Sequence, residues 1–183
     1  MKRSLANQIN QLSVTDKKEL LSLLDEREAA HLREACQENF LPFVQAMWSA
    51  FIEGEHHKMM ADMFDRVAKG ELKRIIINMP PRHTKSEFAS HYLPAWFLGN
   101  YPDKKVIQTA HTAELSVGFG RKVRNLVNSN EFKKVFPDVS LQADSKAAGR
   151  WNTNKGGEYF AIGVGGAVTG KGADLLIIDD PHS

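Results

Sequence analysis

The chain has 183 residues, 42% hydrophobic and 25% charged, which is enough for the core of one ordinary domain with little left for a second. Its formal net charge of +2 is too small to establish a nucleic-acid partner. A single cysteine excludes a disulfide framework and a cysteine-based zinc site and suits a reducing compartment. No apolar run approaches the roughly 18 residues of a membrane span, so we expect a soluble, cytoplasmic protein without a membrane partner.

Residues 1–70 have the pattern of helices. Ser13 to Asp16 offer capping groups, and the leucines that follow recur at helical spacing. The charged run at 25–34 favours a solvated amphipathic helix over one that docks on a partner. Pro42 interrupts the pattern, an apolar helical face restarts at Phe43 and reaches Gly54, and a third helix is expected at about 56–68.

From residue 71 onward the pattern changes to alternating strands and helices. Helices are expected at 87–97 and 113–127, residues 128–154 are rich in loops, and strands are expected at 72–79, 105–110, 158–164 and 174–179. The last of these strands is an apolar run of the kind that lies between two layers of helices. This succession predicts an α/β fold with a parallel sheet flanked by helices. We therefore expect a helical appendage at 1–38 and one domain at 39–183.

The stretch from Met79 to Ser86 carries the first chemical signal. It follows a β-branched run and ends in Lys-Ser where a helix should start, which is the layout of a phosphate-binding P-loop. The turn amides would face phosphates, Lys85 would reach the β- and γ-phosphate oxygens, and the Ser86 hydroxyl would bind Mg²⁺. Met79 and Thr84 stand where the usual pattern has glycine, so the match rests on the strand, the lysine and the serine.

Two basic side chains lie inside this turn. The Arg82 guanidinium either contacts the γ-phosphate or pairs with a nearby acid on the turn surface. Because Thr84 replaces a glycine, we expect either a wider loop or a different loop path that Pro80-Pro81 stiffens. The residues expected to contact nucleotide in this loop are Pro81, Arg82, His83, Thr84, Lys85 and Ser86.

A second signal is the pair Asp179-Asp180, which follows four apolar residues at the end of an expected strand. Alone, this run could be a strand that enters an Asp-Pro turn. Beside a phosphate loop, Asp179 could hold Mg²⁺ through water as in a Walker B strand, and Asp180 could orient the attacking water. The two signals together favour phosphate transfer, with Lys85, Arg82 and Asp180 as the catalytic residues and with Ser86 and Asp179 as the metal ligands.

The segment Gly165 to Gly172 also contains the string G-x-x-x-x-G-K. It places Gly172 where a P-loop needs Ser or Thr, and it leads into a strand, so no helix start would face the phosphates. Two roles remain open for this segment: a connection with glycines at positive φ, or a basic loop near the γ-phosphate or DNA.

From about Phe40 onward the chain resembles the large terminase subunit of tailed bacteriophages and prophages, the ATP-driven motor that packages DNA into procapsids. The segments that carry the resemblance are 80–86, 108–111, 163–174 and 175–181. The resemblance implies an ASCE, helicase-like P-loop fold with ATP and Mg²⁺ as cofactors. It also implies phosphate and metal binding by Lys85 and Ser86, the Walker B carboxylate at Asp179, and the P-loop arginine at Arg82.

Further expectations follow from the same resemblance. Asp180 stands where many members have a catalytic Glu, and His56 and His57 fall near the adenine-recognition segment, so His57 is expected at the nucleotide. The implied partners are double-stranded DNA, the portal protein and the small terminase subunit in the bacterial host cell, with a possible homo-oligomer. The family continues with more core strands and a nuclease domain, so we expect an incomplete sheet, truncated after Walker B, and no nuclease domain.

Two alternatives to a packaging ATPase remain. One is a helicase-like ATPase of DNA repair or recombination that shares the same nucleotide core. The other is a non-catalytic, truncated prophage remnant. A packaging ATPase or a helicase-like ATPase would hold DNA mainly through its phosphates. The candidate contacts are Arg121, Lys122, Arg124 and Lys171.

Overall fold

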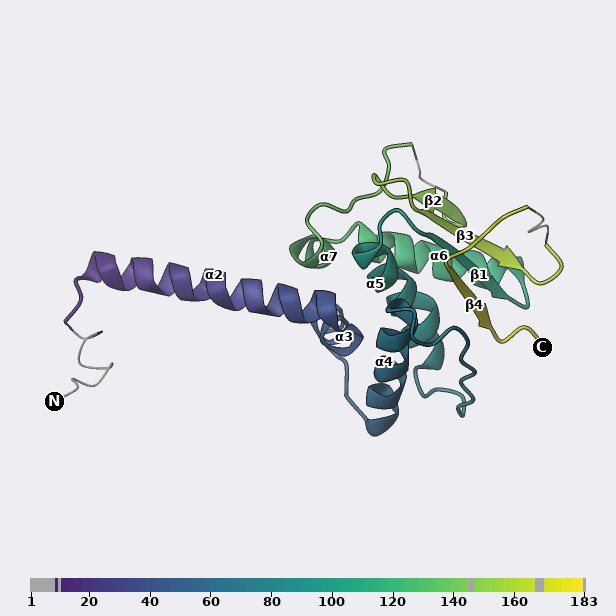
Figure 1. Ribbon diagram of the computed structural model, residues 1–183, viewed down its shortest axis with the longest axis horizontal. Helices are drawn as coiled ribbons and strands as arrows, with labels where there is room; N and C mark the ends of the chain where they lie inside the picture. The colour runs from purple at the N-terminus through teal and green to yellow at the C-terminus, as the bar shows by residue number, and fades with distance from the viewer. Residues whose placement is uncertain (1–8, 10, 145–146, 167–169, 183) are drawn as a thin grey trace.

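The computed structural model describes residues 9, 11–144, 147–166 and 170–182. Over these residues the fold is mixed α/β, with six α-helices, one π-helix and an open four-stranded sheet (Figure 1). The expected α/β class is therefore confirmed at this level. In the part of the chain that the structure describes, no helix has the length and apolarity needed to cross a membrane.

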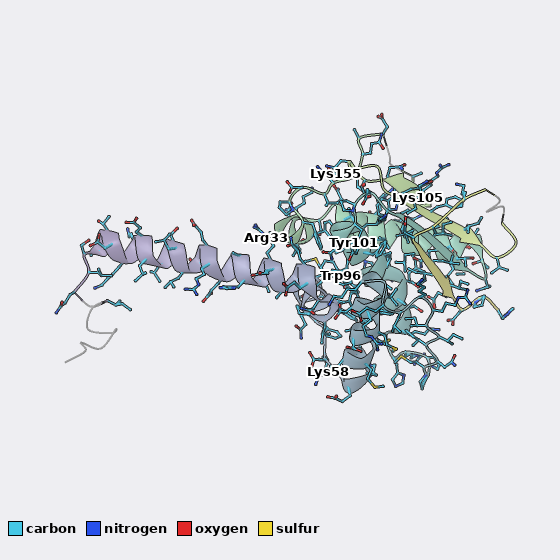
Figure 2. All side chains as sticks on the ribbon, in the orientation of Figure 1. Arg33, Lys58, Trp96, Tyr101, Lys105 and Lys155 are labelled. Atoms are coloured by element: carbon cyan, nitrogen blue, oxygen red, sulfur yellow. The ribbon has the colours of Figure 1, made fainter. Side chains whose placement is uncertain are left out.

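The first described helix, α2 (Val14–Glu38), extends away from the rest of the molecule (Figure 1). Ser13 caps it as expected: the Ser13 hydroxyl accepts the Asp16 N–H, and the Asp16 carboxylate accepts the Ser13 N–H. Only Cys36 is buried along its length. The Trp96 indole donates to the Cys36 carbonyl at 2.8 Å, and the Arg33 guanidinium donates to the Lys134 carbonyl (Figure 2). The helix is thus held by its carboxyl-terminal end alone.

Two shorter helices, α3 (Phe40–Met47) and α4 (Glu55–Ala68), follow. The boundaries expected for the first were wrong, because α3 begins before Pro42 and ends at Met47 instead of reaching Gly54. Pro42 lies in the first turn of α3, where its missing N–H would have no intrahelical partner. The expected third helix is confirmed as α4.

An aromatic cluster joins these helices to the helix that follows the loop at residues 79–84. The ring of Phe40 is fully buried and meets Phe64, Phe88 and Trp96 edge-on, with centroids 5.2 to 5.6 Å apart. Edge-to-face packing at this spacing adds to the free energy gained by burying each ring. The loop-bearing helix is therefore fixed to α3 and α4 by a rigid core.

The helix after the loop starts at Lys85, has π geometry over η1 (Glu87–Tyr92), and continues as α5 (Leu93–Asn100). It extends past the expected end at residue 97. Pro94 offers no N–H, and its ring would crowd the carbonyl four residues earlier, which accounts for the wider turn before it. The Leu93 N–H donates to the Phe88 carbonyl, five residues back.

The sheet has the order β2-β3-β1-β4. Strands β3 (Glu158–Gly163) and β4 (Leu175–Asp179) both pair in parallel with β1 (Lys105–Ala110), which confirms three expected strands within a residue at each end. Within the loop-rich region, β2 (Arg150–Asn152) pairs antiparallel with β3, and α7 (Asn130–Val135) packs near α2. The expected helix at 113–127 is confirmed as α6 (Ala113–Val127).

Helices η1, α5 and α6 contact the strands, and the strand residues that join the core lie on one face of the sheet, among them Val106, Tyr159 and Ile177. On the opposite face, Leu176 and Ile178 are 57% and 58% exposed. The expectation of a fully covered last strand was therefore wrong. β4 is an edge strand, and half of its apolar side chains face outward.

The expectation of a strand at 72–79 was also wrong, because these residues form no hydrogen-bonded ladder with a neighbouring strand. Their side chains do alternate, with Ile75 and Ile77 half-buried and Ile76 exposed. A strand needs a hydrogen-bonded neighbour. Between this extended segment and β4 lies a cavity of about 740 Å³, lined on one side by Ile75 and Ile77 and on the other by residues 175–179.

Candidate functional site

The structure brings Lys85 to the two carboxylates of the expected Walker B segment. Lys85 Nζ lies 2.5 Å from Asp180 Oδ1 and 3.6 Å from Asp179 Oδ1. Lys85 and Asp180 are 95 positions apart in the sequence. A cation from the start of one helix and two anions from the end of a strand therefore meet in one place.

The sheet topology explains why they meet. Asp179 ends β4 and pairs in register with Ala110, the last residue of β1. The His111 N–H donates to the Asp180 carbonyl at 3.3 Å, so the backbones that leave the two strands stay adjacent. Lys85 opens the helix that packs on β4. Ligand sites of open parallel sheets lie at this edge, beyond the carboxyl ends of the strands.

The two carboxylates occupy different environments. Asp179 is buried, and its Oδ2 accepts a hydrogen bond of 2.9 Å from the Ser90 hydroxyl. The Asp180 side chain is exposed, and its backbone has φ of 42°, a left-handed conformation that aspartate tolerates. Asp179 is thus held rigidly by the fold, while Asp180 faces outward and can exchange partners.

Lys85 stays charged at neutral pH in this arrangement. The hydrogen bond to Asp180 raises the pKa of Lys85 above its usual value, partial burial opposes this, and the charge of Asp179 adds to the increase. A half-buried, permanently charged ammonium at a loop-to-helix junction suits an anionic ligand.

The loop before Lys85 has an unusual backbone. Arg82 and Thr84 both have positive φ, at 65° and 63°. For a β-branched residue such as Thr84 this conformation costs about 1–3 kcal/mol. His83 Nδ1 lies 2.9 Å from the Pro81 carbonyl, and the exposed Arg82 side chain makes no ion pair with any described residue. The loop thus presents Arg82 to solvent and holds strain at Thr84.

His57 is buried beneath this loop. Its Nε2 lies 2.6 Å from Thr84 Oγ1, and its Nδ1 accepts the Gly54 N–H at 2.9 Å. Burial, together with the neighbouring His56, lowers the pKa of His57, and Glu53 opposes this shift. His57 is therefore neutral at physiological pH and bound within the chain through both ring nitrogens.

The donor set near Lys85 fits Mg²⁺. Among the described residues, the Ser86 hydroxyl has no hydrogen-bond partner, and Asp179 contributes a fixed carboxylate nearby. No cluster of three or more His, Cys, Asp or Glu residues that could hold a metal occurs in the described ranges. Mg²⁺ prefers hard oxygen ligands and usually takes one or two protein groups together with waters and substrate phosphates. The protein groups that could hold it here are the Ser86 hydroxyl and the Asp179 carboxylate.

Two contributors to the site escaped the sequence interpretation. Ser90 orients Asp179 through a hydrogen bond. Ser90 lies one helical turn after Ser86, and this spacing could have indicated that both serines face the site. Glu87 accepts hydrogen bonds from His91 Nδ1 at 2.9 Å and from Lys122 Nζ, which ties the loop-bearing helix to α6. Lys122, a candidate DNA contact, is thus paired within the protein.

The Glu87 network predicts a pH effect on stability. The hydrogen bond from His91, helped by Lys122 and opposed by burial, lowers the pKa of Glu87 to about 2. Since the folded pKa is depressed below 4.5, Glu87 stabilises the fold above that pH, and the contribution is lost as the pH falls from 4.5 towards 2. In urea denaturation, Glu87→Gln should lower the free energy of unfolding at neutral pH, with the difference from wild type shrinking across that window. A Glu28→Gln control on exposed α2 should show no such trend.

The described ends of the glycine segment, 165–166 and 170–172, lie near β3. Gly165 and Gly170 have positive φ, as a strand connection of this kind requires, while residues 167–169 lie outside the described residues. Lys171 Nζ sits 3.6 Å from the centroid of the Phe160 ring and 4.0 Å from Glu158 Oε1. Lys171 is thus held on the surface of the sheet by a cation–π contact.

No protein-family model, curated protein or solved structure matches the chain.

Proposed function

We propose that this chain binds Mg-ATP through Lys85, Ser86 and Asp179 and hydrolyses it, as the ATPase part of a phage large terminase subunit that powers packaging of double-stranded DNA. The observation that carries the proposal is the convergence of Lys85 on Asp179 and Asp180 at the carboxyl ends of the parallel strands β1 and β4. A lysine from a loop-to-helix turn beside a strand-end carboxylate is the arrangement with which P-loop NTPases carry out phosphoryl transfer.

Lys85 has a specific role in this proposal. Without nucleotide it pairs with Asp180 at 2.5 Å. Phosphate oxygens compete for the same ammonium, and a charge-assisted bond to a multiply charged phosphate replaces the one to the carboxylate. Binding thereby releases the exposed Asp180 carboxylate, which can then accept the proton of the attacking water as a general base.

The remaining groups position the substrate. Ser90 keeps the Asp179 carboxylate in place, and the Ser86 hydroxyl and Asp179 would hold Mg²⁺. The bound Mg²⁺ would neutralise charge on the β- and γ-phosphate oxygens. The exposed Arg82 guanidinium at the tip of the loop can contact the γ-phosphate without first breaking an ion pair to a described residue.

The proposal is tested by isothermal titration of the purified chain with ATP, with and without Mg²⁺. We expect saturable binding that weakens when the metal is chelated, because part of the phosphate charge then remains uncompensated. If a chain that is folded by circular dichroism takes up no nucleotide at millimolar Mg-ATP, the assignment of the site is wrong.

Phosphate release in the presence of DNA separates the motor from its alternatives. Stimulation by double-stranded DNA supports the packaging ATPase and its proposed partners, the portal protein and the small terminase subunit. Stimulation by single strands alone favours the helicase-like ATPase of repair or recombination. Binding of ATP without hydrolysis under either condition favours the non-catalytic remnant.

A further inference from the structure

The conformation of Thr84 is held by side-chain contacts. Its φ of 63° lies in the left-handed region, which glycine enters freely and a β-branched residue avoids. The Thr84 carbonyl accepts the Phe88 N–H at 3.0 Å, which ties the residue to the first turn of the helix. Its hydroxyl is engaged on both sides, by His57 and by the His83 carbonyl. These contacts keep Thr84 in a conformation that it would otherwise leave.

The direction of each hydrogen bond follows from the geometry. The Thr84 hydroxyl donates its only proton to the His83 carbonyl at 2.6 Å, so Thr84 Oγ1 must accept from His57. Independently, His57 Nδ1 accepts the Gly54 N–H, so the ring proton resides on Nε2. Both arguments give the same neutral tautomer, which forms a chain from Gly54 through His57 and Thr84 to His83.

The imidazole has little freedom to move. It stacks on Phe88 with centroids 4.7 Å apart at 28°, and it meets Phe51 edge-on at 4.8 Å. Phe88 belongs to the helix that Lys85 opens, and Gly54 is the cap of α4. The His57 ring therefore links Thr84, the residue just before Lys85, to the helix that carries Phe88.

We propose that His57 is a positioning residue: it fixes Thr84 at positive φ, so that the amides of the loop and Lys85 face phosphate although the loop lacks glycine. This inference rests on the proposed nucleotide site but assigns His57 to the loop instead of to the adenine base. It predicts that His57 matters equally for any ligand with a polyphosphate chain, whatever base the ligand carries.

The test measures Mg²⁺-dependent binding of ATP and of inorganic tripolyphosphate to the full chain. His57→Phe keeps a ring between Phe51 and Phe88 but removes both hydrogen bonds. We expect affinity for both ligands to fall by about tenfold, as for the loss of one or two buried hydrogen bonds. Thr84→Val removes the hydroxyl at nearly constant shape and should cause the same loss. A His31→Phe control on the exposed α2 should bind as wild type does.

A double-mutant cycle identifies the mechanism. Glycine adopts positive φ without support, so Thr84→Gly should make the hydrogen bond between His57 and residue 84 unnecessary. In the Thr84→Gly background, His57→Phe should change affinity by less than about twofold, a clear departure from additivity. His57→Gln, whose amide nitrogen can take the place of Nε2, should recover most of the affinity that His57→Phe loses.

Contrary results would overturn the inference. A full tenfold loss in the Thr84→Gly background, or a loss for ATP with none for tripolyphosphate, would show that His57 acts on the ligand directly. If wild type binds neither ligand, the nucleotide proposal fails. The role of His57 in holding Thr84 is then tested separately, by hydrogen exchange of the 82–88 amides. His57→Phe should speed that exchange about tenfold when residue 84 is Thr and leave it unchanged in the Thr84→Gly background. Unchanged exchange in the chain with Thr84 would show that His57 does not hold the loop.

Discussion

Lys85→Ala is expected to bind Mg-ATP at least about 100-fold more weakly than wild type. Two effects act in the same direction. The variant loses the ammonium that lies 2.5 Å from Asp180 and 3.6 Å from Asp179, and with it the charge-assisted bonds to phosphate. It also leaves Asp179 and Asp180 without their cation, so that two carboxylates repel the incoming phosphates. Titration calorimetry with Mg-ATP measures the loss.

Matched variants make the result specific. Lys133→Ala removes a lysine from the exposed surface of α7 and should leave nucleotide affinity unchanged. Lys85→Arg keeps the charge but brings a wider, planar group, so it should fall between wild type and Lys85→Ala. If Lys85→Ala remains folded and still binds within about threefold of wild type, the phosphate does not contact this lysine, and the proposed site is wrong.

Asp180→Asn is expected to separate binding from hydrolysis. Without the Asp180 carboxylate, Lys85 has no ion pair with residue 180 to break before it binds phosphate. Affinity for Mg-ATP should therefore stay the same or rise. The amide cannot accept a proton as a general base, so the rate of hydrolysis should fall by about 100- to 10,000-fold. Asparagine tolerates the left-handed backbone at this position, with φ of 42°, so the loop geometry should persist. Steady-state phosphate release and calorimetry on the same sample give both values.

The control for this variant is Asp138→Asn, which removes a carboxylate from an exposed position away from the strand ends. Neither binding nor hydrolysis should change. Two outcomes would contradict the role of Asp180: hydrolysis that survives the substitution at the wild-type rate, or a loss of binding as large as that of Lys85→Ala.

The sequence predicted the parts of the site that depend on local chemistry. A helix starting at Lys85 follows from the turn residues before it, and the positions of Asp179 and Asp180 follow from an apolar run that ends abruptly. We expected the two segments to meet because both were expected to follow strands of one parallel sheet. The strand before the loop is absent, and the helix that Lys85 opens reaches Asp179 by packing on β4. The 2.5 Å contact between Lys85 and Asp180 could not be predicted, because it depends on side-chain conformations.

The failures have a common physical cause, which is that pairing and packing are not local. Residues 72–79 have the composition and alternation of a strand, but a strand also needs a neighbour at hydrogen-bonding distance, and a cavity separates this segment from β4. The outward-facing Leu176 and Ile178 escaped prediction because coverage of a sheet depends on where helices pack. The hydrogen bond between His57 and Thr84 joins residues 27 positions apart, and no periodic pattern in the sequence indicates it.

The separation of Lys85 from Asp180 has a consequence during synthesis of the chain. The two residues leave the ribosome 95 positions apart, an interval of about 5 to 20 s at the usual 5–20 residues per second. β4, the last of the described strands, must dock on β1 before the lysine gains its carboxylates. In a nascent chain without β4, the proposed nucleotide site is therefore incomplete. Once β4 is in place, ATP bound at the proposed site would stabilise the folded form by mass action, so the nucleotide would favour the state in which β4 is docked on β1.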